Sequence, residues 1–491
     1  MKVMGNGPSQ VRHSANEIFS LRNSAWRRIQ QHLGWSAVGE VSGSLHDLRR
    51  ICVLASSSRG GTSVTAEFFQ WQGADCDVPS GRMLTLPGEE KPHLVLSGLA
   101  FPTRRQLFDD LGPEDANQHS IARLLAEMTS EIGYPLAHCV DLDLYSLQLY
   151  RRLLLQWPLD MIGLEPGAAI QALADALRRS FGDQYTDSVS QRRRVLECCI
   201  ECFPFVRGAF YDCSSEKQLA DAGRLEQGAW SLEETPFVLP PPWHNATPNE
   251  VAEGTLLLRD PSNAWRLRFW KAVFSAQEMV VLHLARDVRE SIQGLCDGWN
   301  YPFGFQTLPS DAPLAIAGYT DESIGQGAAW KGHRLNFSVD RRLSQQLLAR
   351  RRAMPLVEVC GHQWLYAHEC ILEAADALSL RRIVLPFAAL RDNPTGVFKD
   401  ICRGLGLEVS RSGLTYAKSF PSRWVMATVV DPTAGQGRWR RSRYARDIRR
   451  IAQRADFVSL TRRLQAATVS QTGERDRSAL RHSMPDVHAS A

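Results

Sequence analysis

One short segment, LASSSRGGTSVTAEFF at residues 54–69, constrains the fold of this chain more than any other. An apolar run at residues 51–54 leads into it, and its last part has the apolar spacing of a helix. A strand, a loop of small residues and a helix in this order turn backbone N–H groups toward one point, as in many phosphate sites. The segment therefore predicts an anion site at the first strand–helix junction of an α/β domain.

The loop differs from the usual phosphate-binding motif GxxxxGK[ST]. Thr62, not lysine, follows the second glycine, and the basic residue, Arg59, precedes both glycines. Small residues let the backbone bend around an anion, and hydroxyl groups at the helix N-terminus can add donors. The loop alone fits an ordinary strand-to-helix turn with a surface arginine equally well. The candidate anion-binding residues are Ser57, Ser58, Arg59, Gly60, Gly61, Thr62 and Ser63.

The rest of the chain reads as one α/β domain that is interrupted by helices. Stretches such as HSIARLLAEMTSEIG and AAIQALADALRRSF repeat apolar residues at intervals of three and four, which predicts a mostly helical insertion at residues 104–245. From Gly254 onward, strand-like and helix-like segments alternate again. We therefore predict a central parallel sheet flanked by helices over residues 48–455. Residues 1–47 form an N-terminal extension, and residues 456–491 a tail expected to be disordered after about residue 470.

Composition excludes several classes of protein. The chain has 491 residues, which exceeds the usual size of one domain, and its net charge of +4 is too small to indicate a nucleic-acid binder. No stretch of about 18 apolar residues suggests a membrane span. The first residues lack the apolar segment of a secretion signal, and the 11 cysteines are scattered without paired spacing. A cytoplasmic protein with reduced thiols is the expectation.

A second motif, VVLHLARDVRESIQGL, places Arg286 and Arg289 where an apolar run ends. In a parallel sheet this position is the carboxyl end of a strand, where ligands gather. Arginine can bind a phosphate through two parallel charge-assisted hydrogen bonds. Alone, the motif is also explained by an ordinary ion pair between Arg286 and Asp287.

Together these motifs resemble those of sulfotransferases that use 3′-phosphoadenylyl sulfate (PAPS), in particular the bacterial branch. RGGTS at residues 59–63 is similar to the family loop [KR]-x-G-T-[TS], and LARDVR at residues 284–289 to a strand that ends in RDPR. Three later stretches are similar in the same order: LLLRDPSNAWRLRFWKAVF, LRDNPTGVFKDICRGLGL and GQGRWRRSRY. The likeness runs from about residue 51 to residue 451 and leaves out the helical insertion.

The resemblance implies a P-loop-NTPase-like fold, PAPS as the sulfuryl donor and a hydroxyl acceptor, with a saccharide or glycolipid as the first guess. It implies that the loop embraces the 5′-phosphate. A sulfuryl group carries less charge than a γ-phosphoryl group, so we expect that no bridging magnesium ion is needed. The chain departs from the family where Val288 replaces a proline, where Gly294 replaces a serine and where FAAL at residues 387–390 replaces YEDL. Ser291, one turn earlier, is a possible substitute for the missing serine. The residues implied for the nucleotide elsewhere are Arg286, Ser291, Gly437, Arg438 and Trp439.

The chemistry of sulfuryl transfer gives a role to Arg59, the cation that precedes the two glycines. Transfer relies on positioning and charge stabilisation, and negative charge grows on the bridging oxygen of the departing phosphate. Arg59 is the candidate cation there, and Arg259 is a candidate assistant. The segment PGEEKPHL resembles the family's KEPHFF, whose glutamate accepts the acceptor's proton, so Glu89, Glu90 and His93 are candidate bases. The register does not separate Glu89 from Glu90, and a polar surface turn is the alternative.

Three alternatives remain open. A P-loop kinase that uses ATP and magnesium would explain the first motif, although the lysine of GK[ST] is missing. A nucleotide-binding or scaffolding protein on a decayed core would explain the departures. The four thiols at residues 198–213 could bind zinc, but no second pair accompanies them, so buried helix thiols are the expectation.

Overall fold

The computed structural model describes residues 45–73, 81–99, 111–213, 233–300, 354–423 and 437–471, apart from short gaps inside these ranges, and three two-residue strands between residues 301 and 353. Its centre is a five-stranded sheet in the order β13-β8-β1-β7-β2, in which all neighbours are parallel. The prediction of an α/β fold with a central parallel sheet is confirmed. The strands are β1 (Arg50–Ala55), β2 (Met83–Leu84), β7 (Thr255–Arg259), β8 (Glu278–Ala285) and β13 (Arg381–Pro386).

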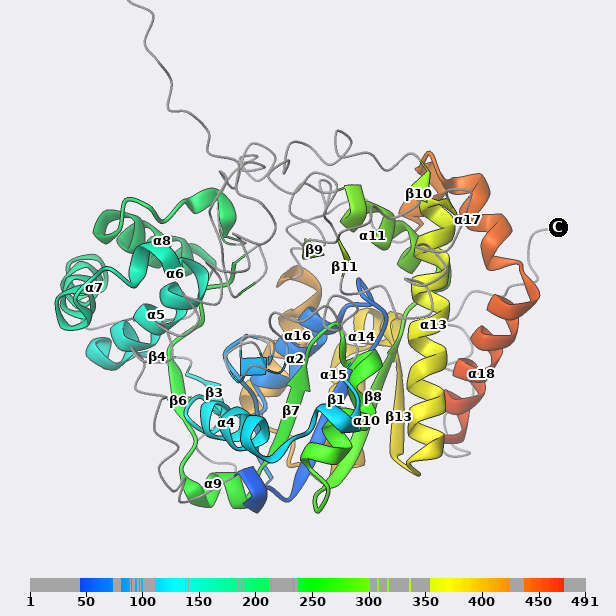
Figure 1. Ribbon diagram of the computed structural model, residues 1–491, viewed down its shortest axis with the longest axis horizontal. Helices are drawn as coiled ribbons and strands as arrows, with labels where there is room; N and C mark the ends of the chain where they lie inside the picture. Colours follow the sequence, from blue (N-terminus) through cyan, green and yellow to red (C-terminus); the bar gives the residue numbers. More distant parts are fainter. Residues whose placement is uncertain are drawn as a thin grey trace, which may run out of the picture.

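Helices cover both faces of this sheet, because both faces are apolar (Figure 1). Ile51 and Val53 of β1 share a buried cluster with helices of one face, and Cys52 and Leu54 share another with helices of the opposite face. This alternation follows from the two-residue period of a strand. The first face carries α4 (Gln118–Thr129), α10 (Asn263–Val273) and part of α13 (Leu356–Ala377), and the second carries α2 (Thr62–Gln70), α15 (Pro394–Leu405) and α16 (Arg411–Arg423).

A further group of helices extends the first face beyond β13. It consists of α11 (Val288–Asn300), the short η8 (Arg438–Arg441), α17 (Ala445–Ala452) and α18 (Ala455–Gln471), packed with α13. Phe457, Leu460 and Leu464 of α18 are buried in this cluster. The packed core therefore continues past residue 455, where the sequence placed the start of a tail.

The helical insertion has an apolar core of its own, which runs from Leu142 to Leu239. It contains α5 (Leu142–Gln156), α6 (Pro158–Met161), α7 (Pro166–Phe181), α8 (Val189–Cys202) and η4 (Gly208–Phe210), which lie to one side of the sheet in Figure 1. Helix α4 lies outside this core: its Leu124 and Met128 pack with the sheet. The insertion is therefore narrower than residues 104–245, because apolar periodicity predicts a helix but not the layer against which it packs.

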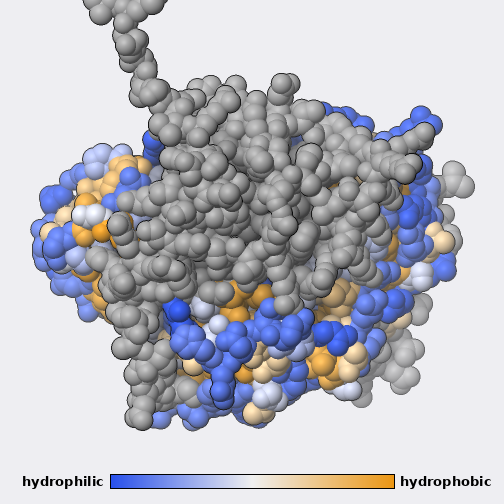
Figure 2. Space-filling model, in the orientation of Figure 1, coloured by the Kyte–Doolittle hydropathy of each residue, from blue (hydrophilic) through white to orange (hydrophobic). Residues whose placement is uncertain are grey.

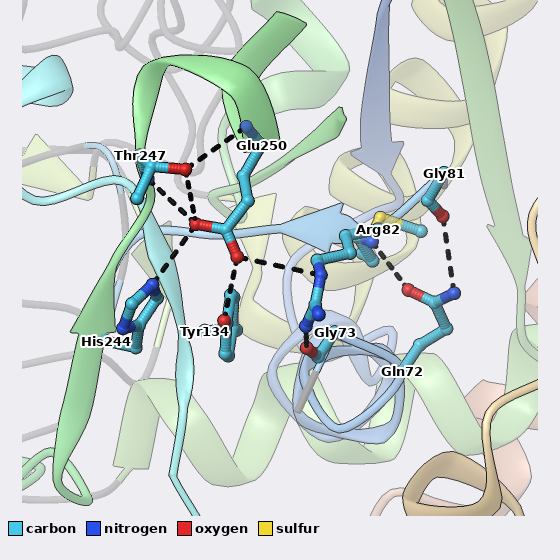
Figure 3. A network of polar contacts seen from close by, with 9 residues as sticks. Gln72, Gly73, Gly81, Arg82, Tyr134, His244, Thr247 and Glu250 are labelled. Carbon is cyan, nitrogen blue, oxygen red and sulfur yellow. Dashed lines mark hydrogen bonds and ion pairs between the residues drawn. The ribbon is translucent and has the colours of Figure 1, made fainter. Parts of the chain in front are cut away.

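A polar network fastens the insertion where it joins the sheet (Figure 3). Strands β3 (Gly133–Pro135) and β6 (Trp243–Asn245) pair antiparallel on either side of the inserted chain. Glu250 of α9 (Pro248–Glu253) accepts hydrogen bonds from the Tyr134 hydroxyl at 2.9 Å and the Thr247 amide at 2.8 Å, and lies 3.1 Å from His244. Burial raises the pKa of Glu250, but these hydrogen bonds outweigh it and lower the pKa to about 2.

The remaining short elements connect these layers. They are η1 (Leu45–Asp47), η3 (Pro113–Asp115), β4 (His138–Cys139), β5 (Tyr185–Thr186), β9 (Thr307–Leu308), β10 (Ile316–Ala317), β11 (Leu335–Asn336), β12 (Met354–Pro355) and α14 (Phe387–Asp392). On the face in Figure 2, hydrophilic residues predominate among the described ones, with apolar residues in separate patches. None of the helices in the described ranges combines the length and the apolar character that crossing a membrane requires.

Candidate functional site

The carboxyl ends of the parallel strands bring the predicted motifs to one edge of the sheet. Strand β1 lies between β7 and β8, and the chain leaves it first toward the β2 side and later toward the β13 side. Ligands of open α/β sheets bind at such a point, outside the carboxyl ends of the strands. The loops after β1, β7 and β8 carry Arg59, Asp260 and Arg286, so three distant segments meet here.

The loop after β1 is tight and fixed on both sides. The Gly60 amide donates to the Ser57 carbonyl at 2.9 Å, and Arg59 adopts φ 60°, a left-handed conformation that is uncommon outside glycine. A Cβ on Gly60 would lie 2.0 Å from Ser56 Oγ, and one on Gly61 would lie 2.4 Å from the Phe387 ring. These close approaches explain both glycines.

The loop ends at the N-terminus of a helix that has no side-chain cap among the described residues. Helix α2 begins at Thr62 without a side-chain cap and without an acidic residue in its first turn, so its dipole and free amides favour an anion. The Ser57 side chain is 1% exposed, and within the described residues its hydroxyl makes no hydrogen bond. Thr62 is buried, Ser63 is exposed and Ser58 is half-buried. A buried hydroxyl without a partner is a costly feature unless a ligand or water completes it.

Arg286 joins this loop from β8. Its Nη1 donates to the Arg59 carbonyl at 2.9 Å, and its guanidinium lies 5.3 Å from the centre of the Phe387 ring. Burial lowers the pKa of Arg286 somewhat, and the positive charges of Arg438 and Arg391 act in the same direction, against the acids Glu290 and Asp287. Arg286, Arg438 and Arg391 thus bring positive charge to one region, where Arg438 forms an ion pair with Asp297 and Arg391 with Asp392.

Helix α11 presents two informative positions to this region. Ser291 is fully buried, and among the described residues its hydroxyl has no hydrogen-bond partner. At Gly294, where the resemblance leads one to expect a serine, a Cβ would lie 3.4 Å from Arg59 Cβ and 3.8 Å from Arg286 Nη1. The position itself is thus next to both arginines, although this chain has no side chain there.

The C-terminal basic stretch lies along the same helix. The Gly437 amide donates to Glu290 at 2.6 Å, and Arg438 forms an ion pair with Asp297. Trp439 is 5% exposed and packs into the core. Its ring therefore contributes no open face, and the stretch approaches the site through its backbone and Arg438.

Arg289, the second arginine of its motif, is turned away from the loop. It forms an ion pair with Asp287 at 2.9 Å, and its guanidinium lies 5.2 Å from the centre of the Trp439 ring. Asp287 thus pairs with Arg289 and not, as the alternative had it, with Arg286, which donates to the loop instead.

Glu90 is held at the end of β7. Its Oε2 accepts the Arg259 amide at 2.8 Å and its Oε1 accepts Asn263 Nδ2 at 2.7 Å. The same Asn263 amide lies 3.4 Å from the carbonyl of Leu54, which places Glu90 beside the end of β1. Burial first, and then the charge of Asp260, raise the pKa of Glu90 to about 7. Glu89 lies outside the described residues.

His93 faces away from this position. It is 1% exposed, and its Nε2 lies 3.3 Å from Glu131 Oε2. Burial raises the pKa of Glu131, but the hydrogen bond and charge of His93 and the charges of Arg152 and Arg151 lower it below its ordinary value. Of the three candidate bases, Glu90 is the one that the described structure places at the carboxyl edge.

Sequence reasoning missed Asn263, Asp260 and Phe387. Asn263 and Asp260 belong to the RDPSN stretch, whose polar residues directly after a buried strand were an available signal. The contact of Phe387 with Gly61 had no signal in the sequence, because it depends on the order of β13, β8 and β1.

The thiols of residues 198–213 contact neighbouring groups of the insertion. Cys198 Sγ lies 3.2 Å from Ser180 Oγ, and Cys202 and Cys213 contact backbone carbonyls. Burial raises the pKa of Cys199 well above its ordinary value. In the described ranges, no group of three or more His, Cys, Asp or Glu side chains is placed to hold a metal ion.

Comparison with known proteins found no match: no family model, no curated protein and no solved structure is significantly similar to the chain.

Proposed function

We propose that this protein transfers a sulfuryl group from PAPS to a hydroxyl acceptor, on a P-loop-like core. The observation that carries the proposal is the loop after β1. Its buried Ser57 hydroxyl has no partner in the described part of the chain, it leads to an uncapped helix N-terminus, and its cation precedes the glycines. These features support the binding of an anion such as a phosphate group at this loop. Its central place in the strand order supports the P-loop-like assignment.

Arg59 is the proposed cation for the leaving group. As the S–O bond breaks, charge grows on the bridging oxygen of the 5′-phosphate, and a fixed cation there stabilises the transition state. The left-handed backbone of Arg59, held by the Gly60 turn and the Arg286 contact, supports a fixed position for this residue. A strained backbone conformation of this kind is typical of functional sites.

The 3′-phosphate is proposed to lie between the loop and α11. Arg286 and Arg438 would supply positive charge there, and the buried Ser291 hydroxyl would donate a hydrogen bond. Ser291 would thus take the role that the family gives to a serine at position 294. Positive charge from arginines is what a phosphate dianion requires of its site.

Glu90 is the proposed base. A carboxyl group with a pKa of about 7 is partly ionised at neutral pH and can both accept and return a proton. Glu90 is 1% exposed and its carboxyl group accepts hydrogen bonds from the Arg259 amide and from Asn263, so the proposal requires the acceptor hydroxyl to enter this buried position.

A magnesium-dependent kinase is the rival that a specific observation favours. Asp260 follows β7, a neighbour of β1, and P-loop enzymes that use magnesium hold the ion with an aspartate. Its Oδ1, however, accepts the Ser262 amide at 2.8 Å and lies 3.4 Å from Arg266 Nη1, and the side chain is 1% exposed. A carboxylate used in this way supports the metal-independent proposal.

Calorimetry with 3′-phosphoadenosine 5′-phosphate (PAP), AMP, and ATP with and without magnesium tests the proposal. We expect PAP to bind more tightly than AMP, and EDTA to have no effect. Equal affinity for PAP and AMP would contradict the assignment, and tight binding of ATP only with magnesium would establish the kinase. Tight PAP binding without conversion of PAPS, once acceptors have been screened, would indicate a non-catalytic nucleotide-binding protein.

A further inference from the structure

The turn that carries Glu90 lies between the sheet and the helical insertion. On the side of the sheet, Arg259 Nη1 donates to the Gly88 carbonyl at 3.1 Å. On the side of the insertion, Arg152 of α5 reaches the same residue: a Cβ on Gly88 would lie 1.9 Å from Arg152 Nη2. Gly88 also has φ 108°, which favours glycine. Arg259 therefore hydrogen-bonds to Gly88, and Arg152 packs closely against the same residue.

Arg152 is itself held by buried groups of the insertion. It is 6% exposed, and its Nε lies 2.5 Å from Glu233 Oε1. Gln156 donates to Glu233 at 2.8 Å and accepts the Tyr211 hydroxyl at 2.8 Å. A guanidinium in such a network has few alternative positions, so it can fix what it touches.

The contacts continue from Gly88 to the carboxyl group of Glu90. Arg259 binds the Gly88 carbonyl with its side chain and Glu90 Oε2 with its backbone amide. Movement of Gly88 toward the insertion would therefore move the turn relative to Arg259 and open the buried site of Glu90. Asp260, Arg266 and Asn263 also face this carboxyl group, and all three lie on the sheet side. On the side of the insertion, Arg152 lies against Gly88 and not against the carboxyl group.

We propose that Arg152 is a positioning residue for Glu90 and that the helical insertion thereby forms part of the reaction site. The inference rests on the proposed role of Glu90 as the base. Arg152 does not touch the carboxyl group; it fixes the turn through Gly88. In this proposal the insertion covers the turn that carries Glu90 and so keeps water away from its carboxyl group.

The test compares the thermal midpoint with and without the substitution Glu90→Gln over a range of pH. This comparison is made in the wild-type background and in backgrounds in which Arg152 or Gly88 is replaced. Arg152→Lys retains a charge for Glu233 but is too short in reach and lacks the planar fork that meets Gly88. Gly88→Ala pushes Arg152 away. Gly182→Ala is the matched control, since Gly182 also has a positive φ of 59° but nothing lies within 4 Å of an added Cβ.

We expect Arg152→Lys and Gly88→Ala each to reduce the pH-dependent effect of Glu90→Gln by at least half, and Gly182→Ala to leave it unchanged. A double variant, Arg152→Ala with Glu233→Gln, should behave like Arg152→Lys without leaving a buried charge unpaired. If these variants lower the midpoint equally at all pH values and the Glu90 effect stays intact, Arg152 is only structural and the inference fails. PAP calorimetry on the same variants separates the two proposals: lack of PAP binding by wild type contradicts the proposed function, whereas the pH result stands independently.

Discussion

Replacing Glu90 by glutamine should change how the stability of the protein depends on pH. In the folded protein burial raises the pKa of this carboxyl group from 4.5 to about 7. Between these two values the folded state holds a proton that the unfolded state has lost, so stability falls as pH rises. The loss should begin near pH 4.5, continue to about pH 7 and then stop. Glutamine has no proton to lose and should remove this part of the pH dependence.

The expected size follows from the shift in pKa. A rise from 4.5 to about 7, at about 1.4 kcal/mol for each pH unit, corresponds to about 3 kcal/mol of stability lost from the wild type by pH 8. Glutamine also loses one acceptor, because Arg259 and Asn263 both donate to the carboxylate, and this should cost about 1–3 kcal/mol at every pH. The prediction therefore concerns the slope with pH, not the absolute stability of the variant.

The assay is the thermal midpoint of both proteins at intervals from about pH 4.5 to pH 8. For a chain of this length, about 3 kcal/mol corresponds to roughly 3 °C. The midpoint of the variant should rise relative to the wild type by about that amount across the range. Glu233, whose pKa burial also raises to about 7, titrates in both proteins and cancels from the difference. The same substitution at the exposed Glu253 is the matched control and should give a flat difference.

A difference between Glu90→Gln and wild type that stays constant across this range would refute the reasoning. It would mean that Glu90 ionises in the folded protein as it does in the unfolded chain. Glu90 would then be surrounded by water or fully compensated by Arg259 and Asn263, and its proposed role as a base poised near neutral pH would lose its physical support.

Three other predictions concern the nucleotide. Arg59→Ala should lower turnover of PAPS by a factor on the order of 10²–10³, while the affinity for PAP changes far less. Arg59→Lys should retain much of the wild-type rate. Arg59→Gly, which relaxes the backbone, should be as slow as Arg59→Ala. Arg286→Ala should lower the preference for PAP over AMP by roughly 10- to 100-fold in calorimetry, with the fold retained by circular dichroism. Gly294→Ser should fold normally, since its Cβ has ordinary contacts, and should raise PAP affinity roughly 2- to 10-fold; unchanged affinity would show that the 3′-phosphate does not reach α11.

The sequence predicted the sheet well because its signal is local. Strands β1, β7 and β8 are continuous apolar runs, as expected for strands that are buried on both faces, and each is followed by the polar loop residues that reach the site. Strand β2 has only two residues, Met83 and Leu84, and no pattern of that length identifies a strand. The sequence also did not show whether α4 packs on the sheet or in the insertion, because its apolar stripe fits both equally well.

The sequence predicted that Arg59 and Arg286 lie at the site, but it did not predict which carboxyl group lies there. Arg59 and Arg286 each follow a strand, so the topology of a parallel sheet alone brings them to one edge. Whether Glu89 or Glu90 lies at the site depends on the direction of one side chain in a turn, and that direction is set by Arg259, Asn263 and the position of Gly88. Two of these residues are about 170 positions away in the sequence, and Gly88 is held in turn by an arginine of the insertion. The chemistry of the proposed base therefore depends on contacts between segments far apart in the sequence, and substitutions at Gly88 and Arg152 should affect it as directly as substitutions beside it.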